Sequence, residues 1–72
     1  MKIVFSSHAE KRIKERGVKK EDIIEVIDFP EYIIRRENNE IEAYKKINNK
    51  MFKVVYIKLE NYIKVITLYY LN

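Results

Sequence analysis

The first part of the chain combines helical spacing with recognisable helix ends. The run from Ser7 to Glu10 has the S-x-x-E form of a capping box, in which each side chain satisfies the other residue's backbone N–H, so a helix is expected to begin near His8. Gly17 is the only glycine, and it follows Arg16 in the position of a C-terminal cap. These signals predict one short helix of about two and a half turns.

A second helix is predicted from Lys19 to Asp28, because acids occupy its first turn and isoleucines share one face. Pro30 prevents the helix from continuing past Phe29. The pattern then changes to runs rich in β-branched and aromatic residues that alternate with asparagine-containing turns. The predicted strands cover residues 32–36, 41–47, 51–59 and 62–71.

These elements predict one α+β domain over residues 1–72, with two N-terminal helices packed on a twisted four-stranded antiparallel sheet that runs as a meander. A short extra strand at Ile3 to Phe5 is an open alternative. The last two strands are apolar on both faces and are expected to be central, whereas 41–47 carries lysines and is expected to be peripheral.

Composition narrows the chemistry. The chain has no cysteine and one histidine, which leaves no thiolate metal site and too few ligands for an ordinary zinc site, so we expect no metal and no cofactor. The N-terminus lacks the apolar region of a signal peptide, and no stretch has the roughly 18 apolar residues that span a bilayer, so we expect a cytoplasmic protein without membrane contact. A core this small would gain from a partner chain, and a homodimer is one expectation.

The formal net charge of +4 is unevenly distributed. Residues 1–20 hold seven basic and two acidic side chains, net +5; residues 21–42 hold two basic and eight acidic, net −6; residues 43–72 hold six basic and one acidic, net +5. If the two basic segments lie side by side, they form a face suited to a polyanion such as RNA, with the acidic middle segment turned elsewhere. The alternative is that each lysine simply solvates an exposed strand.

One histidine and two arginines share a side of the first predicted helix. At about 100° per residue, His8, Arg12 and Arg16 fall within about 80° of one another, beside the apolar pair Ala9 and Ile13. An imidazole beside two guanidinium groups suits metal-free RNA cleavage: a base takes the 2′-hydroxyl proton, and arginines stabilise the scissile phosphate. The simpler interpretation is a surface histidine with arginines that pair with carboxylates.

Aromatic and polar residues on the last two strands form a weaker candidate site. Tyrosines that alternate with lysines can stack on bases and contact phosphates. The same residues are also what strands prefer, so packing is the alternative for each of them. The candidates for RNA binding are Lys53, Tyr56, Lys64 and Tyr69.

The run from Phe5 to Val18 resembles the opening signature of the domain-of-unknown-function 4258 family. In that signature a Phe-Ser step precedes His-Ala, two residues, Arg, three residues, Arg-Gly and an aliphatic residue, and every position matches here. The isoleucine-rich second helix, Phe29-Pro30 and the run from Val65 to Tyr69 fit the later part of the family pattern. The resemblance covers the whole chain.

The family is grouped with the RelE-like and barnase-like toxin folds. The resemblance therefore implies an endoribonuclease toxin of a type II toxin–antitoxin system, which acts on free or ribosome-bound RNA and is controlled by a cognate antitoxin. Carried over to this chain, the motif residues are His8 as general base or acid, with Arg12 and Arg16 on the phosphate. Thr67 is the next candidate, either on a phosphate oxygen or as the residue that orients His8.

Two other interpretations remain open. The same surface could belong to a non-catalytic module that binds RNA or a partner protein. Alternatively, the His8, Arg12 and Arg16 stripe could be a structural lock, in which the arginines bond to strand carbonyls or to Glu42.

Overall fold

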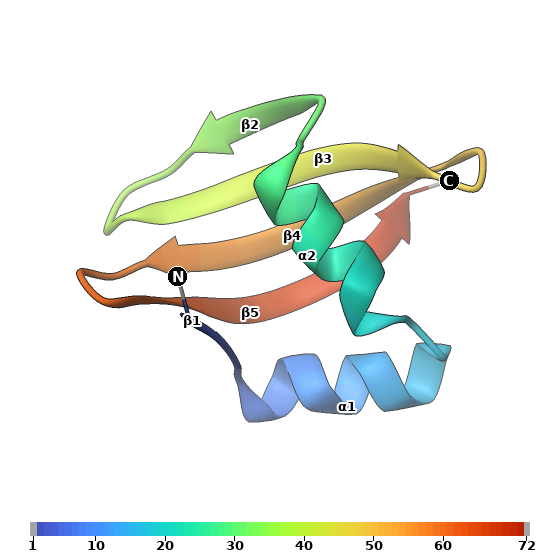
Figure 1. Ribbon diagram of the computed structural model, residues 1–72, viewed down its shortest axis with the longest axis horizontal. Helices are drawn as coiled ribbons and strands as arrows, with labels where there is room; N and C mark the ends of the chain where they lie inside the picture. Colours follow the sequence, from blue (N-terminus) through green and yellow to red (C-terminus); the bar gives the residue numbers. More distant parts are fainter. Residues whose placement is uncertain (1, 72) are drawn as a thin grey trace.

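The computed structural model describes residues 2–71 as two helices and one five-stranded sheet. The elements follow the order β1 (Lys2–Phe5), α1 (Ser7–Arg16), α2 (Lys20–Asp28), β2 (Tyr32–Arg35), β3 (Glu40–Ile47), β4 (Lys50–Lys58) and β5 (Tyr62–Leu71). The strands lie side by side in the order β1-β5-β4-β3-β2 (Figure 1). The α+β class and both helices agree with the sequence prediction.

The prediction of a purely antiparallel four-stranded sheet is wrong. Strands β2 to β5 do form an antiparallel meander, but β1 adds a fifth strand that pairs parallel with β5, with Ile3 opposite Ile63 and Phe5 opposite Val65. The short strand left open at Ile3 to Phe5 is therefore present, and the sheet is mixed. The pairing joins the two ends of the chain, and a local sequence pattern does not predict such a long-range contact.

The expectation that 41–47 is peripheral is also wrong, because β3 lies between β4 and β2. The prediction assumed that the lysines of this strand are exposed at the edge of the sheet. The Lys45 ammonium bonds to the Phe29 carbonyl at 3.0 Å and lies 3.9 Å from Glu25, so it is used to hold the end of α2. The expectation for the last two strands holds, since β4 is flanked by strands on both sides and β5 by β4 and β1.

The ends of the elements follow local chemistry, with one shift. Ser6, rather than Ser7, caps α1: its Oγ accepts from the Ala9 N–H at 3.0 Å and donates to the Ile66 carbonyl at 2.9 Å. That second bond ties the cap to β5, which explains why the earlier serine is used. Gly17 ends the helix in the left-handed conformation at φ 62°, as expected.

The asparagine pairs in the two turns between β2, β3 and β4 also adopt left-handed conformations. The φ values are 58° and 64° at Asn38 and Asn39, and 52° and 69° at Asn48 and Asn49. Asparagine tolerates this region better than most residues, which is why these pairs predicted hairpins correctly.

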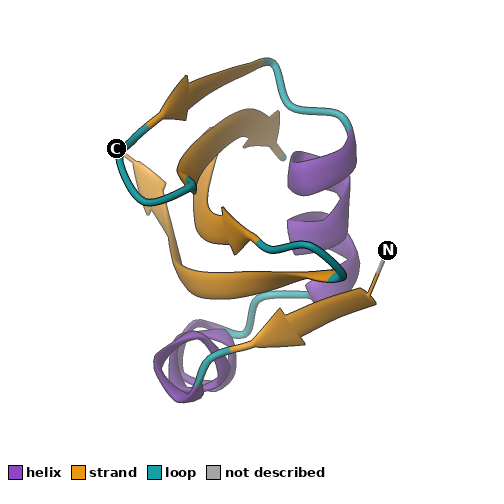
Figure 2. Cartoon of the chain, turned by 90° about the vertical axis from the view of Figure 1, so that its left-hand side faces the viewer, coloured by secondary structure: helices purple, strands orange, loops and turns teal. Residues whose placement is uncertain are grey.

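Strand β1 and helix α1 share the outer side of β5. The backbone N–H of Ser6 bonds to the Val65 carbonyl at 2.9 Å, where β1 ends and the helix begins. Here β5 carries a bulge, because Val55 of β4 pairs with Thr67 while Tyr56 pairs with Val65, leaving Ile66 as the extra residue. Helix α1 continues beside β5, whereas α2 lies across β3 and β4 (Figures 1 and 2).

A single apolar core lies between the helices and one face of the sheet. Ala9 of α1 and Ile23 and Val26 of α2 are fully buried in it. From the strands it takes alternate residues, as a half-covered sheet requires. The strand residues of the core include Ile41, Ala43, Ile47, Phe52, Val54, Tyr56, Ile63, Val65 and Leu68.

Candidate functional site

The other face of the sheet, which we call the open face, carries the polar side chains of the same strands. Residues that alternate with the core residues must point to the opposite side. Strand register places them in two neighbouring rows: Ile34, Glu42, Val55 and Thr67 in the first, and Tyr32, Tyr44, Lys53 and Tyr69 in the second. Each row contains one residue from each of β2, β3, β4 and β5.

Three of the four predicted catalytic residues meet at the α1 end of the first row. The Nε2 atom of His8 lies 3.1 Å from the Thr67 hydroxyl oxygen, and the Nε atom of Arg12 lies 3.5 Å from the same Nε2. His8 is exposed, in the first turn of α1. The contact exists because the Ser6 cap fixes the start of α1 against β5, one residue before Thr67.

The hydrogen-bond roles at His8 follow from Arg12. The Nε–H of an arginine can only donate, so in this arrangement Nε2 of His8 accepts. The Thr67 hydroxyl then donates to the same nitrogen. Two donors share one lone pair, so a substrate hydroxyl can replace either of them.

Arg16 lies one turn beyond Arg12, exposed at the end of α1. Within residues 2–71 it has no hydrogen bond or ion pair to His8 or Thr67. The structural lock through Glu42 is not formed by this helix either: within the same residues the cations that contact Glu42 are Arg36 and Lys53. The stripe is therefore divided: His8 and Arg12 contact each other, and Arg16 stands apart.

Glu42 is the centre of a charged network that the sequence analysis did not propose as a site. The Arg36 guanidinium contacts it at 3.2 Å and 3.5 Å, the Tyr44 hydroxyl donates at 3.1 Å, and the Lys53 ammonium lies 3.6 Å away. The hydrogen bond from Arg36 is the main reason that the pKa of Glu42 is lowered. The signal available in the sequence was Glu42 between the apolar residues Ile41 and Ala43, with Tyr44 two residues later.

Lys53 links that network to the second row. Its ammonium lies 5.5 Å from the Tyr44 ring centre and 5.2 Å from the Tyr69 ring centre. Interaction with Tyr69 raises the pKa of Lys53, and Tyr44 and Glu42 act in the same direction. Lys53 is therefore a held cation on the open face, and Tyr69 is two residues from Thr67 on the same strand and the same face.

Tyr56 and Lys64, the other two predicted RNA-binding residues, do not lie in the row of Lys53 and Tyr69. Tyr56 is buried in the core on the helix side, so the structure separates it from Lys53 and Tyr69, and burial raises the pKa of its hydroxyl. Packing accounts for its position. Lys64 is half-buried opposite Val4 and Ile57, on the open face before the bulge.

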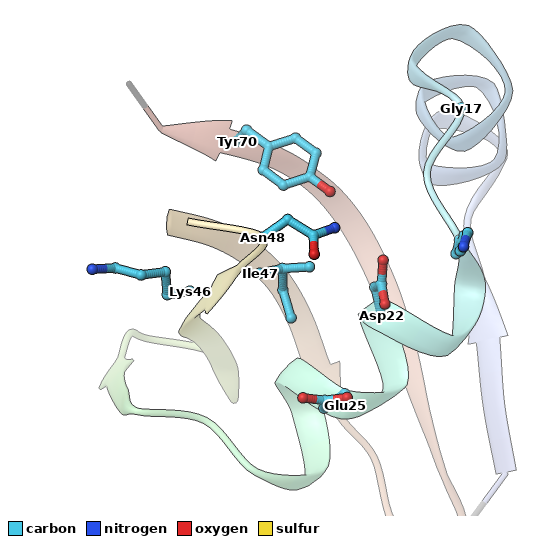
Figure 3. A pocket seen from close by; sticks show the side chains of 8 residues that line it. Gly17, Asp22, Glu25, Lys46, Ile47, Asn48 and Tyr70 are labelled. Atoms are coloured by element: carbon cyan, nitrogen blue, oxygen red, sulfur yellow. The ribbon is translucent and has the colours of Figure 1, made fainter. Parts of the chain in front are cut away.

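A separate polar cavity of about 470 Å³ lies between α2 and the turn joining β3 to β4 (Figure 3). Asp22 and Glu25 line it from the helix, with Asn48 and Tyr70 on the other side. It shares no lining residue with the contact between His8 and Thr67. The candidate site is therefore the open face together with the start of α1.

Comparison with known proteins identifies the family. The family model described as "Domain of unknown function (DUF4258)" matches residues 5–70. Because the match covers almost the whole chain, this protein belongs to that family. Neither the curated proteins nor the solved structures contain a significant match.

Two further observations concern residues 2–71. Neither of their helices has the length and apolar character needed to cross a bilayer. Their acidic side chains and single histidine form no group of three or more arranged to hold a metal ion.

Proposed function

We propose that this protein is a metal-free endoribonuclease with His8 as its proton-transfer residue. The observation that carries the proposal is the convergence of His8, Arg12 and Thr67, from the two ends of the chain, on one exposed imidazole nitrogen. The acceptor nitrogen is the form that a general base requires. Arg12 supplies a fixed positive charge at the position where a phosphate would lie.

The proposed reaction is cleavage by the neighbouring 2′-hydroxyl. Thr67 orients the His8 ring before RNA binds; a substrate 2′-hydroxyl then takes the place of Thr67 at Nε2 of His8 and gives up its proton, while its oxygen attacks phosphorus and forms a 2′,3′-cyclic phosphate. The bond from phosphorus to the 5′ oxygen breaks, and the proton held by His8 passes to that oxygen. Arg12 stabilises the charge on the phosphate, and Arg16 approaches a neighbouring phosphate rather than the reacting one.

The wider assignment rests on the resemblance to toxin ribonucleases. A RelE-like domain that acts as the toxin of a type II toxin–antitoxin pair would cleave free or ribosome-bound RNA inside the cytoplasm. Its antitoxin would cover the open face and the start of α1, where Arg12, Lys53 and Lys64 supply positive charge. A second copy of the chain is another partner to test.

A cleavage assay tests the proposal directly. Purified protein is incubated with labelled single-stranded RNA, with and without ribosomes, and products are examined for cyclic phosphate ends. We expect cleavage that persists in EDTA, a loss of about 100-fold or more in His8→Ala, and partial rescue of that variant by added imidazole. Intact RNA under both conditions would contradict the proposal.

The two arginines provide a matched pair on one helix. Arg12→Ala is expected to lower kcat/KM far more than Arg16→Ala, because only Arg12 contacts His8. Equal effects of the two substitutions would assign both arginines to general attraction of RNA. They would also remove the reason to place the phosphate at His8.

A non-catalytic RNA-binding module is the second candidate. The second row has Tyr69 at one end and Tyr32 at the other, and these offer binding groups whatever His8 does. In that case Arg12→Ala weakens binding and reduces its salt dependence, while His8→Ala has little effect and no RNA is cleaved.

A further inference from the structure

We propose that Tyr32 and Arg36 form a second nucleotide subsite at the β2 side of the open face. A single-stranded RNA would then cross the strands from the start of α1 towards β2, with one base on the ring of Tyr32 and one phosphate on Arg36. The inference rests on the proposed function in one respect: that function places the cleaved end of the RNA at the start of α1. The binding it describes can be measured separately from cleavage.

The first observation is a stack that continues across the sheet. The rings of Tyr32 and Tyr44 are nearly parallel, 11° apart with centres 4.5 Å apart. On the next strand the Lys53 ammonium lies over Tyr44 and also over Tyr69. Four residues in one row of the sheet are therefore in contact from β2 to β5.

The second observation is that the inner and outer members of this stack differ in exposure. Tyr44 is only 7% exposed, so no base can reach its ring. Tyr32, on the edge strand, is 49% exposed although its ring already stacks on Tyr44. A rigid aromatic ring with a buried ring beneath it is a ready platform for a base, because every base offers a π face.

The third observation is that the Arg36 guanidinium, next to the Tyr32 ring, is held by Glu42 through only some of its N–H donors. The Arg36 side chain is 56% exposed, and only its Nε and Nη2 atoms contact Glu42. A guanidinium has five N–H donors, so the rest are available for phosphate oxygens. Glu42 is two residues from Tyr44 on the same face of β3, which places Arg36 beside the stack.

The span of the surface sets the size of the ligand. Three strand spacings separate β5 from β2, about 14 Å in all. One nucleotide cannot contact both His8 and Tyr32 over that distance, so the subsite is used only by a longer strand. Unpaired RNA is the class that fits, because stacking on an exposed ring needs a base that is free of its partner.

The test measures binding of RNA that cannot be cleaved. Fluorescence anisotropy is recorded with a labelled 2′-O-methyl RNA decamer and with the matching dinucleotide. Tyr32→Leu is expected to weaken decamer binding about tenfold and to leave dinucleotide binding unchanged, while Tyr32→Phe stays close to the original. The control is Phe29→Leu, which removes a ring that is 69% exposed but outside the stack and should change neither affinity.

Arg36 has its own matched control in Arg35. The two residues are consecutive, but Arg35 pairs with the core residue Ile41 and so points to the other side of the sheet. Arg36→Gln is expected to reduce the salt dependence of decamer binding by about 0.7 in the log–log slope, and Arg35→Gln should reduce it much less. This pair of variants decides the question even if Tyr32→Leu proves unstable by circular dichroism.

The possible results separate this proposal from the proposed function. Decamer binding that depends on Tyr32 and Arg36 without any RNA cleavage would support the subsite and overturn the ribonuclease. Cleavage that depends on His8, together with decamer binding that is indifferent to Tyr32 and Arg36, would do the reverse. Equal losses in Tyr32→Leu and Phe29→Leu would show that apolar surface in general is responsible and would also overturn the subsite.

Discussion

The two faces of the sheet are built from alternate residues of the same strands, yet they differ in almost every physical property. On β4, Phe52 and Val54 are fully buried under the helices, whereas Lys53 between them points to the open face and contacts a carboxylate. The covered face is held by apolar area removed from water. The open face is held by hydrogen bonds and ring contacts among Glu42, Tyr44 and Lys53, whose side chains are themselves largely shielded from solvent.

This difference shows where function can be placed at low cost to stability. A polar group on the covered face would lose its water without gaining a partner. On the open face Glu42 retains hydrogen bonds to Arg36 and Tyr44, and Thr67 retains one to His8. Substitutions should therefore have stability effects that depend on the face, and under the proposed function specific effects on RNA are expected only on the open face and at α1.

The largest stability effect is expected on the covered face. Phe52→Ala removes a fully buried ring that stacks on Tyr70 with centres 4.6 Å apart, and it should lower the free energy of unfolding by about 3–5 kcal/mol. Urea unfolding followed by circular dichroism measures the change. Lys50→Ala, an exposed position on the same strand, is the control. A loss below about 1 kcal/mol would mean that the core repacks around the missing ring.

A smaller effect is expected at the centre of the open face. Glu42→Ala leaves Lys53 without its carboxylate and Tyr44 without its acceptor, and it should cost about 1–3 kcal/mol, because both groups are largely shielded from the water that would replace the carboxylate. The same unfolding experiment tests it. An unchanged stability would mean that water replaces the carboxylate without loss.

The response to pH should also differ between the faces. The pKa of Glu42 is lower in the folded protein, chiefly through Arg36, so its contribution is complete above the usual glutamate pKa of about 4.3 and is lost as the pH falls through the lowered value. Glu42→Gln should flatten the loss of stability at acid pH. Thermal melts between pH 2 and 7 measure this, with the exposed Glu60→Gln as control.

The smallest stability effect is expected at Thr67. Thr67→Val keeps the shape and the strand preference of the residue but removes the hydroxyl that contacts His8, so the free energy of unfolding should change by less than about 0.5 kcal/mol. Under the proposed function the cleavage rate should fall nevertheless. If Thr67→Val lowers the melting temperature markedly as well as the cleavage rate, the contact only holds α1 to the sheet.

The sequence predicted the local elements well and the long-range pairing less well. Gly17 and the asparagine pairs marked the end of a helix and two turns, because their backbone conformations are restricted wherever they occur. Strand β1 has only four residues, so the sequence pattern left it as an open alternative, and its parallel pairing with β5 joins the two ends of the chain. The cap of α1 moved to Ser6 because Ile66 offered a second hydrogen bond.

The candidate site shows the same division. Helical spacing placed His8 and Arg12 on one side of α1, and alternation placed Lys53 and Tyr69 among the strand candidates. The same alternation already puts Tyr56 on the side of β4 opposite to Lys53, whereas only the bulge in β5 puts Lys64 and Tyr69 on one face. Glu42 and Arg36 were missed as a pair, because the contact depends on the turn that brings the residue after β2 back over β3.

By itself the sequence determined which residues form helices, turns and strands, and which side chains share a face of each element, since these follow from backbone preference and from periods of 3.6 and 2. Only the tertiary structure decided which faces meet. The bond from Ser6 to β5 sets His8 against Thr67, and strand register aligns Tyr32, Tyr44, Lys53 and Tyr69 in one row. Both are contacts between distant parts of the chain, and they form only when the apolar faces are buried together.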